Sequence, residues 1–202
     1  MKTKLGPLFR KEIIISLHLF DSLVKPILLY GSDFWGCLKL PKDNLIETVH
    51  ISFCKEVLGV QKQTPNIGVL LELGRTPLQI YAKKNCIKYW EKIALQKNAN
   101  LITRKTYEWS LQNETGWGYS VKKYLSQIGL MNVFLNIGVN KSANMEVFNR
   151  EKYIFHQLSF HDTQNNFSKL KTYAKLKTNI GLEKYIVSVK NVTDRISLTK
   201  LY

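Results

Sequence analysis

Apolar residues recur at intervals of three and four along most of this chain, and strict alternation of apolar and polar residues is scarce. The first such segment has its apolar positions at Ile13, Leu17, Phe20, Val24 and Ile27. This spacing places the side chains on one face of a helix, which we expect to face a core. Pro26 lacks an amide hydrogen and crowds the preceding turn, so it predicts a kink in that helix.

Signals for helix starts and stops follow. Asn44 can cap a second helix while Glu47, three residues on, reaches back to it, and Gly59 can end that helix. Two Thr-Pro pairs, Thr64-Pro65 and Thr76-Pro77, each predict a helix that a threonine caps and a proline opens. The second of these helices should continue to about residue 97.

The stretch "QNETGWGYS", residues 112–120, concentrates glycine and polar residues, so it predicts the main internal boundary. Further helices are expected at about 143–161, 168–178 and 193–202, and the last has no stop signal. The sequence therefore predicts an all-α fold, an irregular bundle divisible into two small subdomains, 1–112 and 113–202. We expect the second subdomain to be truncated at its end, and the chain to be a piece of something longer.

The charge balance indicates which partners the protein binds. Thirty Lys and Arg residues stand against 15 Asp and Glu residues, which gives a net charge of +15 and an isoelectric point near 9.7. Such a balance favours polyanions, with nucleic acid first and an anionic membrane surface second. No window of the chain reaches the ~18 consecutive apolar residues that a membrane span requires, so we expect no membrane partner.

Most of the excess positive charge lies in residues 81–105 and 168–202. Lysines of the first segment recur mainly at four-residue intervals, which lets them meet successive phosphates from one side of a helix. Lysines of the second segment surround Tyr173, a mixture that suits a nucleic-acid backbone and its bases. The candidate nucleic-acid contacts are Lys83, Lys84, Lys88, Lys92, Lys169, Lys171, Lys175 and Lys177. The alternative is a lysine-rich face that is merely solvated.

Sequence motifs for catalysis are missing. The chain has no phosphate-cradling Gly-rich loop and no His-Glu-x-x-His, so we expect no catalytic residue, no metal ligand and no cofactor. His50 and Cys54 lie one helical turn apart, a spacing at which they could share a metal, but they border an apolar stripe and packing is the favoured interpretation. Three unpaired cysteines favour a reducing compartment, and therefore an intracellular protein of the nucleus or cytoplasm.

Three blocks of the sequence resemble a known family. They are "LFDSLVKPILLYGSDFWG" (19–36), "CKEVLGVQKQTPNIGVLLELGRTPL" (54–78) and "IKYWEKI" (87–93). Together they resemble the segment after the polymerase palm in non-LTR (LINE-type) retrotransposon reverse transcriptases. The later "GWGYSVKKYLSQIGL" (116–130) and "SKLKTYAKLK" (168–177) resemble the same family, so the similarity covers most of the chain.

The resemblance implies a helical thumb over residues 1–112 and a connector over 113–202, which would grip a template–primer duplex. It singles out Arg75, in "ELGRTPL", as a direct backbone contact; a salt bridge to Glu72 is the alternative. The family's Phe/Tyr-x-Asp-Asp pair, which binds the catalytic metals, has no counterpart here. We therefore expect no polymerase activity and no enzyme.

Two functions from different classes remain open. The first is a helical module that binds an RNA or DNA duplex without sequence preference, alongside the missing polymerase domains. The second is a helical protein-interaction module, or a structural remnant of a mobile element without selected function. A continuous positive surface over the lysines would distinguish the first from the second.

Overall fold

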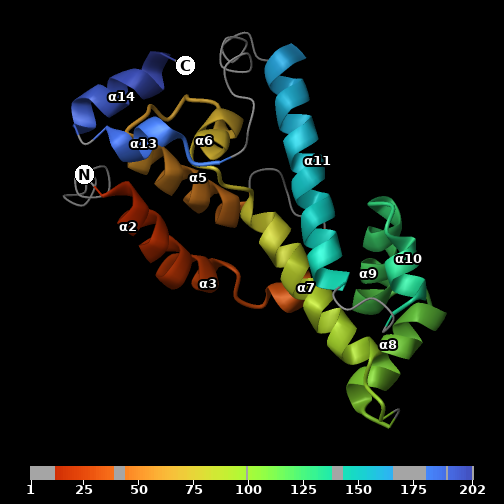
Figure 1. Cartoon of the computed structure of the whole chain (residues 1–202). Helices are drawn as coiled ribbons and strands as arrows, with labels where there is room; N and C mark the ends of the chain where they lie inside the picture. The colour runs from red at the N-terminus through yellow and green to blue at the C-terminus, as the bar shows by residue number, and fades with distance from the viewer. Residues whose placement is uncertain are drawn as a thin grey trace. The chain divides into compact units, whose positions relative to one another are not determined.

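A computed structural model describes residues 12–38, 44–98, 100–137, 143–165, 181–189 and 191–201 (Figure 1). The fold is all-α, as the sequence predicts. The chain divides into two compact units. Unit 1 comprises Met1–Leu28, Asp43–Leu78 and Ile154–Tyr202, and unit 2 comprises Leu29–Lys42 and Gln79–Tyr153. These units divide the chain differently from the predicted boundary at 112/113, which falls inside unit 2 between two helices that pack together.

The first helical segment of unit 1 contains a π-helical turn. It consists of α2 (Ile13–Leu19), the π-helix η1 (Phe20–Val24) and α3 (Lys25–Leu28). The wider turn gives the Pro26 ring room and adds one residue to the helical repeat. The predicted kink site is thus a π-turn.

The extra residue shifts the buried face of this segment. Up to Phe20 the predicted apolar positions are buried or half-buried. After the turn the prediction is wrong, because Val24 and Ile27 are exposed while their neighbours Lys25 and Leu28 are half-buried. A shift of one position is what one inserted residue produces.

Helix α5 (Leu45–Leu58) follows its sequence signals closely. The Asn44 side chain accepts a hydrogen bond from the Glu47 amide at 2.8 Å, and Gly59 adopts a left-handed conformation with φ of 70°. Both predicted ends are therefore confirmed. Helix α6 (Asn66–Glu72) begins one residue later than predicted, after Pro65.

The last described segment of unit 1 packs on α6. It includes α13 (Lys184–Ser188) and α14 (Val192–Leu201), and Leu73 and Leu182 form an isolated antiparallel bridge. The backbone approaches most closely at Gly74, whose φ is +62°, because a Cβ there would lie 2.6 Å from the Gly181 carbonyl carbon. Ile186 completes a core built mainly from α5 and α6.

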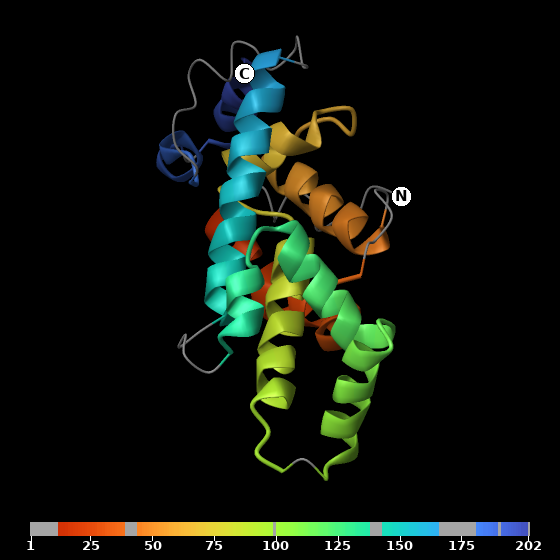
Figure 2. The ribbon, with the colours of Figure 1, turned by 90° about the vertical axis from the view of Figure 1, so that its right-hand side faces the viewer.

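Unit 2 is built around α7 (Leu78–Ala94), whose first residue, Leu78, belongs to unit 1. Helix α7 forms an antiparallel hairpin with α8 (Ile102–Gln112) (Figure 2). The unit also contains α4 (Ser32–Trp35), α9 (Gly116–Gln127), α10 (Met131–Leu135) and the first part of α11 (Ala143–Asn165). Glu91 of α7 fixes the start of α11, since its carboxylate accepts hydrogen bonds from the Ala143 amide and the Asn144 side chain at 2.6 and 2.8 Å. Residues 193–202 and 143–161 were predicted helical, and the described parts of both are.

The N-terminus of α7 is capped by a residue distant in sequence. Thr76 was expected to cap it, but the Thr76 hydroxyl is buried and has no hydrogen-bond partner in the described part of the chain. The Leu78 amide donates instead to the Glu47 carboxylate at 2.8 Å. Glu47 therefore serves α7 rather than reaching back to its own cap residue, as the capping-box prediction required.

Candidate nucleic-acid interface

Helix α7 places three of the predicted contact lysines four residues apart. Lys88 and Lys92 are exposed, and within the described ranges neither side chain has a partner. Lys84 is half-buried, and its Nζ lies 4.8 Å from the ring centroid of Phe148 on α11. The amines of Lys88 and Lys92 lie on consecutive turns of α7 and are thus available to phosphates, whereas the amine of Lys84 is partly covered.

Lys83 points to a different side of α7 and is held inside unit 2. Its Nζ lies 2.7 Å from a carboxylate oxygen of Glu151 and 5.1 Å from the ring centroid of Tyr124. The Tyr124 hydroxyl donates to the same Glu151 oxygen at 2.7 Å. Burial and this carboxylate both raise the pKa of Tyr124 above its ordinary value, so the hydroxyl stays protonated. The structure therefore gives the predicted contact Lys83 a structural role.

Arg75 lies in a polar network of unit 1. Its terminal nitrogens donate to the two carboxylate oxygens of Asp21 at 2.6 and 3.3 Å, and its Nε donates to Nε2 of His50 at 2.9 Å. The guanidinium also lies 5.3 Å from the ring centroid of Phe20, and only 11% of the side chain is exposed. The ion pair that Arg75 forms is therefore with Asp21, 54 residues away, rather than with the expected Glu72.

His50 links the guanidinium to α5. The ring is fully buried, and its Nδ1 donates to the Glu47 carboxylate at 3.0 Å because Nε2 accepts from Arg75. Burial lowers the pKa of His50 below its ordinary value of 6.5, and the hydrogen bond to Glu47 opposes this only in part. The neutral ring is thus a connecting element of the network.

A metal shared by His50 and Cys54, the less favoured interpretation of their spacing, is not supported by this arrangement. Both His50 ring nitrogens are occupied, and burial raises the pKa of Cys54 to about 12, so its thiol is protonated at neutral pH. Within the described ranges no group of three His, Cys, Asp or Glu side chains is placed to hold a metal. The packing interpretation of this pair is the one the geometry supports.

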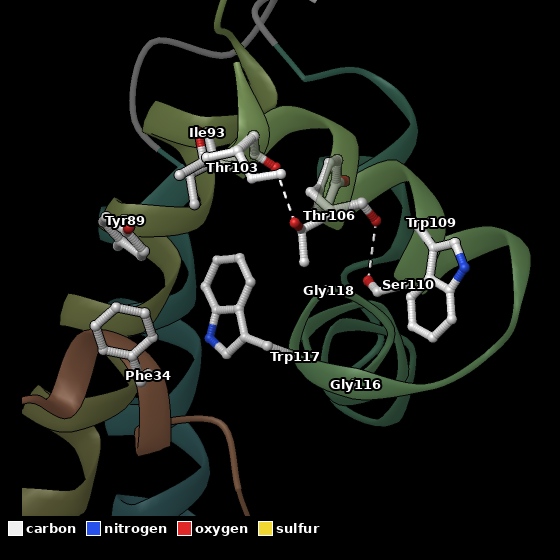
Figure 3. A pocket seen from close by; sticks show the side chains of 12 residues that line it. Phe34, Tyr89, Ile93, Thr103, Thr106, Trp109, Ser110, Gly116, Trp117 and Gly118 are labelled. Atoms are coloured by element: carbon white, nitrogen blue, oxygen red, sulfur yellow. Dashed lines mark hydrogen bonds between the residues drawn. The ribbon is translucent and has the colours of Figure 1, made fainter. Parts of the chain in front are cut away.

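A hollow lined mainly by aromatic side chains opens beside α7 in unit 2 (Figure 3). Its volume is about 280 Å³, and α4, α7, α8 and α9 contribute Phe34, Tyr89, Trp109 and Trp117 respectively. The ring centroids of Phe34 and Tyr89 are 5.2 Å apart, and those of Tyr89 and Trp117 are 5.6 Å apart. We call this the aromatic pocket.

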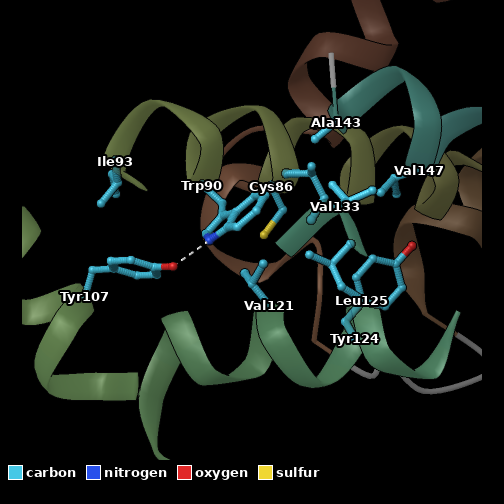
Figure 4. Packing of buried hydrophobic residues seen from close by; sticks show 11 residues of the cluster. Cys86, Trp90, Ile93, Tyr107, Val121, Tyr124, Leu125, Val133, Ala143 and Val147 are labelled. Atoms are coloured by element: carbon cyan, nitrogen blue, oxygen red, sulfur yellow. Dashed lines mark hydrogen bonds between the residues drawn. The ribbon is translucent and has the colours of Figure 1, made fainter. Parts of the chain in front are cut away.

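The aromatic pocket rests on the core of unit 2 (Figure 4), which surrounds the fully buried Trp90. The indole of Trp90 donates to the Tyr107 hydroxyl at 3.0 Å, and Tyr107 belongs to both the core and the pocket wall. Gly118 lets α8 and α9 approach, because a Cβ there would collide with Ser110 and Tyr107. The wall behind the pocket is therefore rigidly packed.

A second hollow of unit 2, about 520 Å³ in volume, is lined by Cys37, Lys83 and Glu151. Hydrogen bonding to Cys86 and burial raise the pKa of Cys37, so it is a thiol and not a thiolate. Lys83 and Glu151 neutralise one another. These three side chains are therefore engaged within the protein, and none of them is an activated nucleophile.

The sequence did not single out the aromatic pocket. Trp109, which lines the pocket, is 56% exposed. The available signal was "GWG", since a tryptophan between two glycines at a helix start marks a close approach of two helices. The predicted contacts Lys169, Lys171, Lys175 and Lys177 lie outside the described residues.

No protein-family model matches this chain, and neither does any curated protein or solved structure. The described helices include none with both the length and the apolar character needed to cross a membrane.

Proposed function

We propose that this chain is a non-catalytic helical module that binds nucleic acid through its backbone phosphates, of the kind that follows the palm in LINE-type reverse transcriptases. The exposure of Lys88 and Lys92 on consecutive turns of α7 is the observation that supports this function. Exposed amines at that spacing meet successive phosphates of one strand. The partner is an RNA or DNA duplex, together with polymerase domains that this sequence does not contain, in the nucleus or cytoplasm.

The local charge supports the same proposal. Residues 81–105 contain seven Lys and Arg residues and one Glu. That Glu is Glu91, whose carboxylate is already engaged by the start of α11. These neutral donors leave the charge of Glu91 in place, so one carboxylate stands against seven basic residues in this segment. The resulting positive field attracts any phosphate backbone regardless of sequence.

The two other predicted contacts within unit 2 and unit 1 have lesser roles in this proposal. Lys83 is neutralised by Glu151, and Arg75 is neutralised by Asp21. Moving Lys83 to a phosphate would leave Glu151 with the Tyr124 hydroxyl, and moving Arg75 would leave Asp21 with Lys25 at 3.9 Å. Each move removes the closest cation from its carboxylate, which costs free energy. Lys84 contributes to phosphate binding only when its amine moves away from the Phe148 ring.

The test is an anisotropy titration of a labelled duplex over a salt series, with the wild-type chain and a Lys88→Ala/Lys92→Ala variant. Each phosphate contact contributes about −0.9 to the log–log salt slope on DNA. We expect the variant to bind unrelated duplexes more weakly by similar factors, with a slope flatter by up to about two units.

A charge-matched control is Lys62→Ala/Lys123→Ala, which removes two exposed lysines that do not lie on α7. It should lose less affinity than the α7 variant. Equal losses of affinity in the two variants would show that only the net charge of the protein matters. Unchanged affinity and slope in the α7 variant would show that α7 is not the contact surface.

One observation favours the second candidate, a protein-interaction module. The helical segment α2 to α3 leaves several large apolar side chains exposed: Ile15 is 55% exposed, Leu23 is 61% exposed and Ile27 is 75% exposed. Exposed apolar groups gathered on one segment are typical of surfaces that bind another protein. The variant Leu23→Ser/Ile27→Ser should bind the duplex as the wild type does. Its self-association, measured by light scattering, should be weaker.

A further inference from the structure

The aromatic pocket has a fixed geometry before any ligand enters. The indole nitrogen of Trp117 donates to the Asp33 carbonyl at 3.2 Å, which ties α9 to the segment that carries Phe34. The rings of Phe34, Tyr89 and Trp117 form a continuous series of tilted and edge contacts. Figure 3 shows Trp117 extending from α9 towards the other two rings. Preorganised rings of this kind bind a ligand with little loss of conformational entropy.

The polar groups of the pocket wall favour a planar, largely apolar ligand. The Thr106 hydroxyl donates to the Ile102 carbonyl at 2.8 Å, and the Ser110 hydroxyl donates to the Tyr107 carbonyl at 2.9 Å. Both hydroxyl hydrogens are therefore used within α8. The wall offers ring faces and few free donors, so it recognises shape and stacking more than a hydrogen-bond pattern.

Positive charge borders the same wall. Lys88 precedes Tyr89 on α7, Lys92 precedes Ile93, and the exposed Lys105 precedes Thr106 on α8. Tyr89, Ile93 and Thr106 all line the pocket. A ligand that fills the pocket with a flat ring and carries negative charge at the pocket edge satisfies both features.

We infer that the aromatic pocket receives one unpaired base of a nucleic-acid strand whose phosphates lie along Lys88 and Lys92. A volume of about 280 Å³ is near the lower end for ligand pockets, which suits one ring system rather than several. The ligand class is single-stranded RNA or DNA, or the unpaired end of a duplex. This inference rests on the proposed phosphate-binding function and adds a site for the base.

The test compares single strands with duplexes. Phe34→Ala/Trp109→Ala removes two pocket rings that are 59% and 56% exposed, so the core behind them is retained. We expect this variant to bind oligo(dT) and oligo(U) about tenfold more weakly, as expected for the loss of base stacking. Its affinity for a blunt duplex should be unchanged. Comparison of the two oligomers distinguishes DNA from RNA.

Tyr30→Ala is the matched control, because Tyr30 is an 87% exposed aromatic residue outside the pocket. It should bind both single strands like the wild type. A second measurement is photocrosslinking of 5-iodouracil in oligo(U), which should attach to Trp109 or Trp117 and lose most of its yield when Phe34 is replaced by Ala.

The outcomes separate the two proposals. If the pocket variant binds oligo(dT) and oligo(U) as tightly as the wild type, the base site is refuted, and an aromatic or proline-rich peptide becomes the alternative occupant. If the Lys88→Ala/Lys92→Ala variant also binds normally, the phosphate-binding function fails as well. Loss of binding only in the lysine variant leaves the phosphate function standing without the pocket.

Discussion

Arg75 of unit 1 and the lysines Lys88 and Lys92 of unit 2 lie in opposite environments. In unit 1 the guanidinium of Arg75 is enclosed by Asp21, His50 and the Phe20 ring. In unit 2 the amines of Lys88 and Lys92 are exposed, and the described residues give them no partner. A basic residue in a favourable sequence block is therefore no guide to binding until its partners within the chain are known.

The chemistry of the two side chains explains the difference. A guanidinium presents several donors in one plane, so it can bind both oxygens of a carboxylate and a third acceptor at once. An ammonium on a flexible stem is strongly hydrated and gains little from a surface ion pair. Unit 1 thus gains rigidity from Arg75, whereas Lys88 and Lys92 of unit 2 stay available.

Arg75→Ala is the strongest test of this contrast. It leaves the buried His50 nitrogen without its donor and leaves Asp21 with Lys25 at 3.9 Å. We expect the free energy of unfolding to fall by about 2–3 kcal/mol. Urea denaturation followed by circular dichroism measures the loss. Arg75→Lys should recover only part of it, since an ammonium cannot reproduce the fork. An unchanged denaturation midpoint for Arg75→Ala would contradict a structural role for this network.

Glu47 should have the next largest effect, because one carboxylate serves both His50 and the α7 amide of Leu78. We expect Glu47→Ala to lower the free energy of unfolding by about 1–2 kcal/mol. Thr76→Val is the informative companion, since the Thr76 hydroxyl is buried and finds no partner among the described groups. Valine should be neutral or slightly stabilising in thermal melts, and a loss there would restore Thr76 as the cap.

The pH dependence of stability should reveal the buried ring of His50. Burial lowers the pKa of His50, so below about pH 6.5 the unfolded chain binds a proton that the folded chain does not. The contribution of His50 to stability is constant above that pH and falls as the pH decreases through it, by at most about 1.4 kcal/mol per pH unit.

His50→Gln retains hydrogen-bonding groups and removes the titration. Urea midpoints of this variant at about pH 7.5 and about pH 5.5 should differ less than those of the wild type. The other three histidines are common to both proteins, so their contribution cancels. Equal shifts in the two proteins would show that folding does not change the pKa of His50.

Local signals in the sequence were sufficient wherever the partner lies within one helical turn. Asn44 and Gly59 mark the ends of α5, and both were predicted from the residues of that helix alone. The all-α class follows from many such signals together. Each depends on backbone geometry that repeats every few residues, and this is why one sequence reveals it.

Features that depend on distant partners could not be predicted in this way. Arg75 meets Asp21 across 54 residues, and Glu47 caps a helix that begins 31 residues later. The π-turn near Pro26 was not predicted either, because the periodicity before it gives no sign of an inserted residue. The candidate site shows both cases. The spacing of Lys88 and Lys92 could be predicted from the sequence, but the aromatic pocket could not, because its residues come from four helices.

Substitutions of the α7 lysines should have the smallest effects on the free energy of unfolding. The size of each effect should depend on whether the lysine has a partner within the chain. Lys84 covers the Phe148 ring, so Lys84→Ala should lower the free energy of unfolding by about 0.5–1 kcal/mol. Lys88→Ala/Lys92→Ala removes exposed amines and should change it by less than about 0.5 kcal/mol. Thermal melts of the two variants beside Arg75→Ala place all three on one scale. If the double variant is destabilised as much as Lys84→Ala, then Lys88 and Lys92 have partners within the chain, and the contrast with Arg75 disappears.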